Sequence, residues 1–334
     1  MAEGHKRVLQ RCEFWSHIHL DYICLFSSIS PAINAAPDNP IYRSNRAAAF
    51  MSASRYSAAL EDCKVADELS PNDPKIKLRM ARVYTFLGRP REALDIYDSI
   101  QPPVSATDKA PAVTMMQHLE QAEAALKDST SGSMVIHALD QAEKGLGLGV
   151  ERPRKWKLMR GEAYLKMGNV NSLGEAQNVA MSLLRNNSQD PEALVLRGRI
   201  LYAQGENDKA VQHFRQALNC DPDFKDAVKW LRTVQKLDRM KEEGNNDFKM
   251  GRYQQAVDKY TQALEVDPAN KGTNSKILQN RALCYIKVSL QISLRIFSAT
   301  NTNITVKAMA IRNLRLRPRP LPRPLVPQGP QNPR

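Results

Sequence analysis

The chain has 334 residues and a formal net charge of +13, with 48 Lys and Arg residues against 35 Asp and Glu residues. Hydrophobic residues make up 42% of the sequence, which is enough for a folded core and excludes a wholly disordered chain. The 5 Cys residues are well separated, so they do not form a disulfide framework, and no uninterrupted apolar run predicts a membrane-spanning helix.

The first segment, residues 1–38, is predicted to be atypical, because residues 7–30 show neither helical periodicity nor a repeated motif. It contains four residues of types that bind metals: Cys12, His17, His19 and Cys24. Their spacing matches no common zinc pattern, so the sequence predicts no metal site and no cofactor.

Residues 191–222 and 237–268 are copies of one motif. Five matching positions are all offset by 46 residues: Gly198, Ala210, Phe214, Ala217 and Pro222 recur as Gly244, Ala256, Tyr260, Ala263 and Pro268. In each copy we expect two helices, because a small residue allows close approach, an aromatic residue fills the space between neighbours, and Pro ends the second helix. The turn between the helices contains Gly205 or Gly251, which tolerate left-handed geometry.

Weaker copies lie on either side of this motif, at residues 41–71, 75–100 and 155–187, with a first helix only at 275–288. Residues 107–149 form a further helix pair without the motif. Residues 224–244 lack Pro and internal Gly, so they are predicted to form one long helix. Because a single helix pair cannot bury its apolar face alone, the fold is predicted to be an all-α solenoid of about six stacked pairs.

The sequence predicts five segments. They are an atypical N-terminal segment (1–38), a first repeat block (39–149), middle units with a linking helix (150–236), the start of a second block (237–287) and a disordered tail (288–334). The tail has no acid and eight bases: Arg295, Lys307, Arg312, Arg315, Arg317, Arg319, Arg323 and Arg334. It ends in an Arg-Pro run that is predicted to be extended or disordered.

The order of small residue, aromatic, Ala, aromatic, Ala and Pro resembles the tetratricopeptide-repeat (TPR) family over residues 39–287. The order and spacing of the whole array resemble the cytosolic J-protein co-chaperones with two TPR blocks, of the DnaJ homolog subfamily C member seven type. In that family a J domain with a His-Pro-Asp motif follows the last repeat, and this sequence contains no His-Pro-Asp. The resemblance implies a co-chaperone adaptor without a J domain, located in the cytoplasm, with the nucleus as a further location.

Six residues resemble parts of the carboxylate clamp with which chaperone-binding TPR domains hold EEVD-type C-terminal tails: Asn45, Lys75, Arg79, Lys241, Asn245 and Asn280. The resemblance implies that the partners are heat-shock chaperones of the seventy- and ninety-kilodalton families. Independently of it, Lys75 and Arg79 are four residues apart and share a helix face, as do Lys241 and Asn245. Lys, Arg and Asn donors match a terminal carboxylate through charge-assisted hydrogen bonds.

Two departures from the family divide this clamp into two halves. Met1 and His5 stand where the first clamp helix of the family has Lys and Asn, and the unit that begins at 275–288 lacks a second helix. We interpret both end segments as truncation or gene-model products. The loss of two ligands out of five is expected to weaken binding by roughly 3–6 kcal/mol.

Two other functions remain open: a TPR scaffold of another protein complex, and a nucleic-acid binder that acts through the basic tail. The sequence contains no nucleophile, base and acid in a catalytic arrangement, so we do not expect an enzyme. Residues 145–149 contain three Gly residues but are predicted to follow a helix, which favours a helix cap and linker over a phosphate-binding loop. Trp156 and Trp230 are predicted core residues.

Overall fold

The computed structural model describes residues 33–34, 36–128 and 131–315, and α-helix is the only regular secondary structure within them. The helices within these residues are α2 (Pro40–Ser52), α3 (Tyr56–Leu69), α4 (Pro74–Phe86), α5 (Pro90–Ser99), α6 (Ala106–Lys127), α7 (Gly132–Glu143), α8 (Arg154–Met167), α9 (Val170–Asn186), α10 (Pro191–Ala203), α11 (Asn207–Cys220), α12 (Lys225–Lys249), α13 (Tyr253–Val266) and α14 (Lys271–Arg315). Nearly all of the atypical segment 1–38 lies outside the described residues, including its four Cys and His residues.

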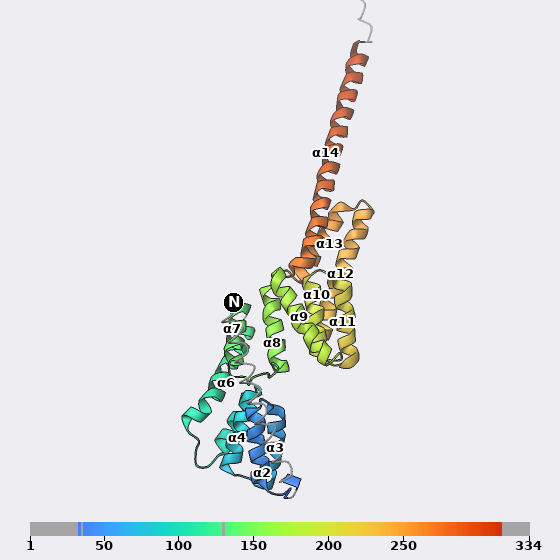
Figure 1. The fold of residues 1–334 in the computed structure, drawn as a ribbon. Helices are drawn as coiled ribbons and strands as arrows, with labels where there is room; N and C mark the ends of the chain where they lie inside the picture. The colour runs from blue at the N-terminus through green and yellow to red at the C-terminus, as the bar shows by residue number, and fades with distance from the viewer. Residues whose placement is uncertain (1–32, 35, 129–130, 316–334) are drawn as a thin grey trace, which may run out of the picture. The chain divides into compact units, whose positions relative to one another are not determined.

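Successive helices pack in pairs: α2 with α3, α4 with α5, α6 with α7, α8 with α9, and α10 with α11. Helices α12 and α13 are joined by the Glu243–Lys259 ion pair. Figure 1 labels these helices. The prediction of an all-α array of about six helix pairs is therefore confirmed. Contacts divide the chain into two compact units. Among the described residues, one unit comprises those up to Gln235 together with Asn270–Thr273, and the other comprises Lys236–Ala269 together with those from Asn274 onward.

In the first unit, the leading helices of successive pairs form a continuous row. Helix α2 contacts α4, α4 contacts α6, α6 contacts α8, and α8 contacts α10, in addition to the contacts within each pair. Such a row brings side chains from different repeats onto one surface. A ligand on this surface therefore meets residues that are 30 or more residues apart in sequence.

The repeated Gly of the motif has a packing cause. A Cβ atom on Gly198 would lie 2.5 Å from the ring of Phe214, and one on Gly244 would lie 2.8 Å from the ring of Tyr260. The aromatic ring of each second helix thus packs directly on the backbone of the first helix. This contact explains why Gly and aromatic residues recur together at the 46-residue offset.

Short-range signals fix the ends of many helices. The side chains of Asn39, Asp73 and Asp190 each accept a hydrogen bond from a backbone N–H of the helix that follows, and Pro occupies the first turn. The turns inside two pairs place Gly205 and Gly251 at φ values of 79° and 76°, in the left-handed region that favours Gly.

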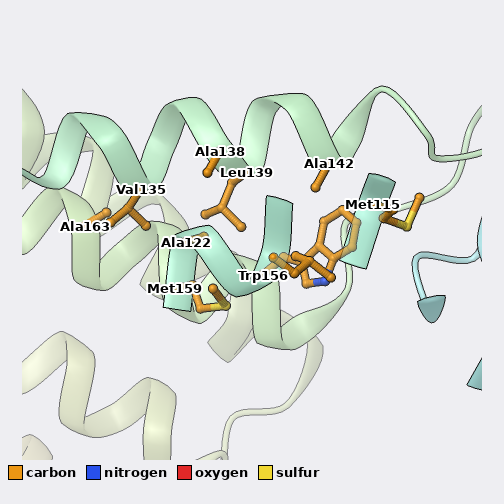
Figure 2. Packing of buried hydrophobic residues seen from close by; sticks show 10 residues of the cluster. Met115, Ala122, Val135, Ala138, Leu139, Ala142, Trp156, Met159 and Ala163 are labelled. Carbon is orange, nitrogen blue, oxygen red and sulfur yellow. The ribbon is translucent and has the colours of Figure 1, made fainter. Parts of the chain in front are cut away.

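A hydrophobic cluster between α6, α7 and α8 fills the middle of the first unit (Figure 2). Trp156 is only 3% exposed and packs there with Met115, Leu139 and Met159, which confirms Trp156 as a core residue. Trp230 is only half-buried, and its ring centroid lies 6.1 Å from that of Tyr202. Residues 145–149 follow the end of α7 as turns, in agreement with the predicted helix cap and linker.

Two long helices occur in the C-terminal third. Helix α12 confirms the single helix predicted for residues 224–244. Helix α14 continues to Arg315, so residues 288–315 of the expected disordered tail are helical here. The physical reason is that neither Gly nor Pro occurs between Gly272 and Pro318, so nothing interrupts the helical hydrogen bonds. The Arg-Pro run lies outside the described residues.

Candidate functional site

A groove with a volume of about 390 Å³ lies between α2 and α4 in the first unit. Its lining residues are Ala48, Met51, Ser52, Lys75, Leu78, Arg79 and Arg82. Helix α2 contributes the small and uncharged part of this wall, and α4 contributes all three basic residues. We call it the α2–α4 groove.

Lys75 and Arg79 lie together in the α2–α4 groove, one helical turn apart. Arg79 is half-buried, and its Nη1 donates to the backbone oxygen of Ser44 at 2.6 Å and to the Ser44 hydroxyl. These acceptors are neutral. Among the described residues, neither Lys75 nor Arg79 forms an ion pair with a carboxylate, so both positive charges remain available to an acidic ligand.

Asn45 lies on α2 next to Ser44, and its side chain is exposed, but it does not line the α2–α4 groove. Its neighbour Arg46 instead forms a bidentate pair with the carboxylate of Asp62, with both N–O distances 2.6 Å. This pair raises the pKa of Arg46 and joins α2 to α3. The residues around Asn45 therefore include an ion pair that holds α2 against α3 beside the groove.

A second groove of about 270 Å³ lies between α12, α13 and α14 in the second unit. Its lining residues are Asn245, Phe248, Lys249, Tyr260, Asn280 and Leu283. We call it the α12–α14 groove. Two of its residues, Asn245 and Asn280, are predicted site residues that are 35 positions apart in the chain.

The Asn245 side chain is the centre of a hydrogen-bond network in the α12–α14 groove. Its Oδ1 accepts one bond from the Tyr260 hydroxyl at 2.6 Å and another from Nδ2 of Asn280 at 3.2 Å. Because the Asn245 oxygen already accepts two hydrogen bonds, the polar group that Asn245 can still offer a ligand is its Nδ2 donor. Nδ2 of Asn280 also retains one N–H that can donate. Burial raises the pKa of Tyr260, so its hydroxyl stays protonated and remains a donor at neutral pH.

Lys241 lies one turn before Asn245 on α12, but it does not line the α12–α14 groove. Its ammonium group donates to the carboxylate of Asp238 at 2.7 Å. The cation that lines the groove is Lys249, which is exposed and forms no ion pair with a carboxylate among the described residues. Lys249, and not Lys241, is therefore the Lys residue on α12 that lines this groove.

Sequence reasoning missed three groove residues. Arg82 lines the α2–α4 groove, and its Nη2 lies 2.5 Å from Oδ1 of Asp108. Tyr260 was recognisable as the repeat aromatic, but its hydroxyl contact with Asn245 depends on the packing of α13 against α12. Lys249 follows Asn245 by four residues, and this spacing was the available signal that both share one helix face.

The described residues contain no group of three or more Cys, His, Asp or Glu side chains placed to hold a metal ion. Within the same part of the chain, no helix has both the length and the hydropathy needed to cross a membrane.

Comparison with known proteins identifies the repeats. Family models described as "Tetratricopeptide repeat" match residues 50–105, 191–224 and 249–272. The chain is 33% identical over 269 residues to the DnaJ homolog subfamily C member 7 homolog of Schizosaccharomyces pombe, which covers 80% of this chain and 50% of that protein. It is 30% identical over 268 residues to DnaJ homolog subfamily C member 7 of Homo sapiens, covering 78% of this chain and 52% of that protein.

The crystal structure of the P58(IPK) TPR domain aligns with 20% identity and a TM-score of 0.45, covering 80% of this chain and 74% of that chain. The chain spans about half the length of the curated relatives it matches. From the three matched repeat segments and the shared sequence, the chain is a tetratricopeptide-repeat protein homologous to the DnaJ homolog subfamily C member 7 proteins.

Proposed function

We propose that this protein is a co-chaperone adaptor that binds the acidic C-terminal, EEVD-type tails of heat-shock chaperones of the seventy- and ninety-kilodalton families. It acts in the cytoplasm by binding, and it catalyses no reaction. The observation that carries the proposal is the α2–α4 groove, where Lys75 and Arg79 lie one turn apart with no carboxylate partner among the described residues. The names of its relatives, which include the DnaJ designation, support the same reading.

The chemistry of the two grooves suits a chain end. A C-terminal carboxylate carries a full negative charge and several acceptor positions, and an acidic tail adds side-chain carboxylates. Lys75 and Arg79 offer charged donors in one groove. Lys249 offers a charged donor in the other, where the amides of Asn245 and Asn280 offer neutral donors. Each charge-assisted bond contributes about 1.5–3 kcal/mol.

Both grooves also have an apolar side that suits the aliphatic residue next to such an end. Met51 and Leu78 line the α2–α4 groove, and Phe248 and Leu283 line the α12–α14 groove. A short acidic peptide with an apolar residue directly before its C-terminal Asp can bury that apolar side chain while its carboxylates meet the basic side. Apolar burial of this size contributes about 1.5–3 kcal/mol.

Fluorescence titration of an EEVD-ended peptide tests the proposal, with a C-terminally amidated peptide as the comparison. We expect the amide to bind more weakly, because amidation removes the terminal charge. Lys75→Ala should weaken binding of the free acid by about tenfold, which corresponds to about 1.4 kcal/mol. Equal affinity for the acid and the amide would reject the proposal.

Matched control variants distinguish the loss of a contact in a groove from the loss of one positive charge elsewhere on the protein. Lys64 on α3 is exposed and lies outside the α2–α4 groove, so Lys64→Ala should change the affinity by less than about twofold. In the second unit, Lys249→Ala is compared in the same way with Lys236→Ala, an exposed residue outside the α12–α14 groove. A similar loss in a groove variant and its control would show that net charge alone attracts the peptide.

A further inference from the structure

An ion pair recurs inside the repeats, at a fixed place in the motif. The first member directly precedes the small residue of the first helix. The second member lies 16 positions after the first member. In the α2–α3 pair these residues are Arg46 and Asp62, at 2.6 Å. In the α12–α13 pair they are Glu243 and Lys259, at 2.7 Å. Opposite charges at this place thus join the two helices of a repeat. The basic residue is on the first helix in the α2–α3 pair and on the second helix in the α12–α13 pair.

The α10–α11 pair has two basic residues at this place. Arg197 precedes Gly198, and His213 follows Arg197 by 16 positions; both are offset by 46 residues from Glu243 and Lys259. Arg197 Nη1 and His213 Nδ1 are buried atoms that form no hydrogen bond. An acidic partner is present at this place in the α2–α3 and α12–α13 pairs and absent from it in the α10–α11 pair.

Two neighbouring acids form ion pairs with other basic residues. Glu206, at the start of α11, acts on Arg197 electrostatically, but its carboxylate lies 2.6 Å from Nζ of Lys209. Glu162 on α8 pairs with Arg199 instead. Burial lowers the pKa of Arg197 more than the charge of Glu206 raises it, and burial followed by the Arg197 charge lowers the pKa of His213.

We propose that Arg197 and His213 form a binding site for an oxyanion, either the carboxylate of an acidic partner residue or a free phosphate. The anion supplies the negative charge that Asp62 supplies in the α2–α3 pair and Glu243 in the α12–α13 pair. A guanidinium group binds such oxyanions through two parallel N–H donors, and a protonated imidazole adds a third. Both residues are half-buried, while the two nitrogens without a hydrogen bond are themselves buried. This site lies outside both grooves and does not rest on the peptide-binding proposal.

NMR titration of the histidine signals in the full chain tests this site, with His213→Gln used to assign the His213 resonance. Sodium phosphate and a short poly-Glu peptide are added separately, against sodium chloride at equal ionic strength. We expect a bound anion to raise the pKa of His213 by about 1, because a nearby negative charge favours imidazolium. A shift with phosphate alone identifies free phosphate as the ligand, and a shift with the peptide alone identifies an acidic side chain.

Two variants make the result decisive. His213→Asp rebuilds the Arg46–Asp62 arrangement, so thermal unfolding of this variant should no longer depend on phosphate or the peptide, whereas the wild-type Tm rises with the ligand that binds. The double variant Lys75→Ala/Lys249→Ala leaves the site intact and should keep the full His213 response. A His213 pKa that neither ligand changes, or an unchanged ligand dependence of Tm in His213→Asp, would overturn the proposal.

Discussion

Single hydrogen bonds decide what each groove can recognise. Asn245 has both a donor and an acceptor on its side chain, and it is the Tyr260 hydroxyl, together with Asn280, that occupies the acceptor. The Asn side chains of the groove therefore present N–H groups, which in the proposed function donate to a peptide carboxylate. In the α2–α4 groove, Ser44 has a comparable role, because it holds Arg79 in place without neutralising its charge.

Tyr260→Phe tests this orientation. The variant keeps the buried ring but removes the donor to Asn245, so the amide can turn and present its oxygen to the peptide. We expect the affinity for an EEVD-ended peptide to fall by about fivefold, which corresponds to about 1 kcal/mol. Tyr253→Phe is the control, because Tyr253 contacts Phe248 through its ring and lies outside the groove lining. Equal affinity in Tyr260→Phe and the wild type would show that the hydroxyl does not orient Asn245.

Cys63 gives a pH-dependent prediction for the same unit as the α2–α4 groove. Burial raises the pKa of its thiol from 9.0 to about 12, so the folded protein keeps this proton to a higher pH than the unfolded chain does. The stabilisation is complete below pH 9 and is lost as the pH rises from 9 to 12, by about 1.4 kcal/mol per pH unit at most. Urea unfolding at pH 8 and pH 10 should show a smaller decrease for Cys63→Ala than for the wild type. Equal decreases in unfolding free energy for the two proteins would show that Cys63 does not cause this pH dependence.

At the scale of the elements, the contact between a small residue and an aromatic ring holds the α10–α11 and α12–α13 pairs together. Gly198 and Phe214 meet so closely that a methyl group at position 198 has no room. Gly174, in contrast, is an exposed helical residue on α9, and a methyl group added there would meet no atom within 4 Å. These two glycines allow the packing effect to be separated from the helix propensity of Ala.

Gly198→Ala should destabilise the protein by about 1–3 kcal/mol, because the added methyl group displaces the Phe214 ring. Gly174→Ala should stabilise it by about 0.5–1 kcal/mol, since Ala favours a helix and meets no neighbour. Chemical denaturation monitored by circular dichroism measures both changes. A stabilising Gly198→Ala would mean that the first helix of a repeat does not need a small residue at this position.

At the scale of the whole molecule, the charge is unevenly distributed, since residues 288–334 contribute eight bases and no acid to the net charge of +13. A tail of this kind attracts any polyanion without specific contacts, and such attraction weakens steeply with salt. Contacts inside a groove depend less on salt, because the Debye length is only about 8 Å at physiological ionic strength. Salt therefore separates the adaptor proposal from the nucleic-acid alternative.

We expect that replacing Arg317, Arg319 and Arg323 by Gln in the full chain leaves the affinity for an EEVD-ended peptide within about twofold at about 150 mM salt. Binding of a short DNA oligonucleotide to the same variant should fall, with a shallower dependence on salt concentration. Fluorescence anisotropy measures both ligands. A large loss of peptide affinity in this variant would show that the tail binds the peptide and would contradict the proposal that the grooves bind it.

The sequence by itself determined the repeat architecture, because Gly198 and Phe214 and their counterparts 46 residues later report local packing that each repeat must satisfy. It also indicated that Lys75 and Arg79 share a face, because residues four apart on one helix lie side by side. Only the tertiary structure decided which predicted residues line a groove. Lys249, and not Lys241, lines the groove with Asn245, and Lys241 instead donates to Asp238. Contacts between helices, such as those of Tyr260 and Asn280 with Asn245, depend on how the helices pack, and sequence spacing does not specify that packing.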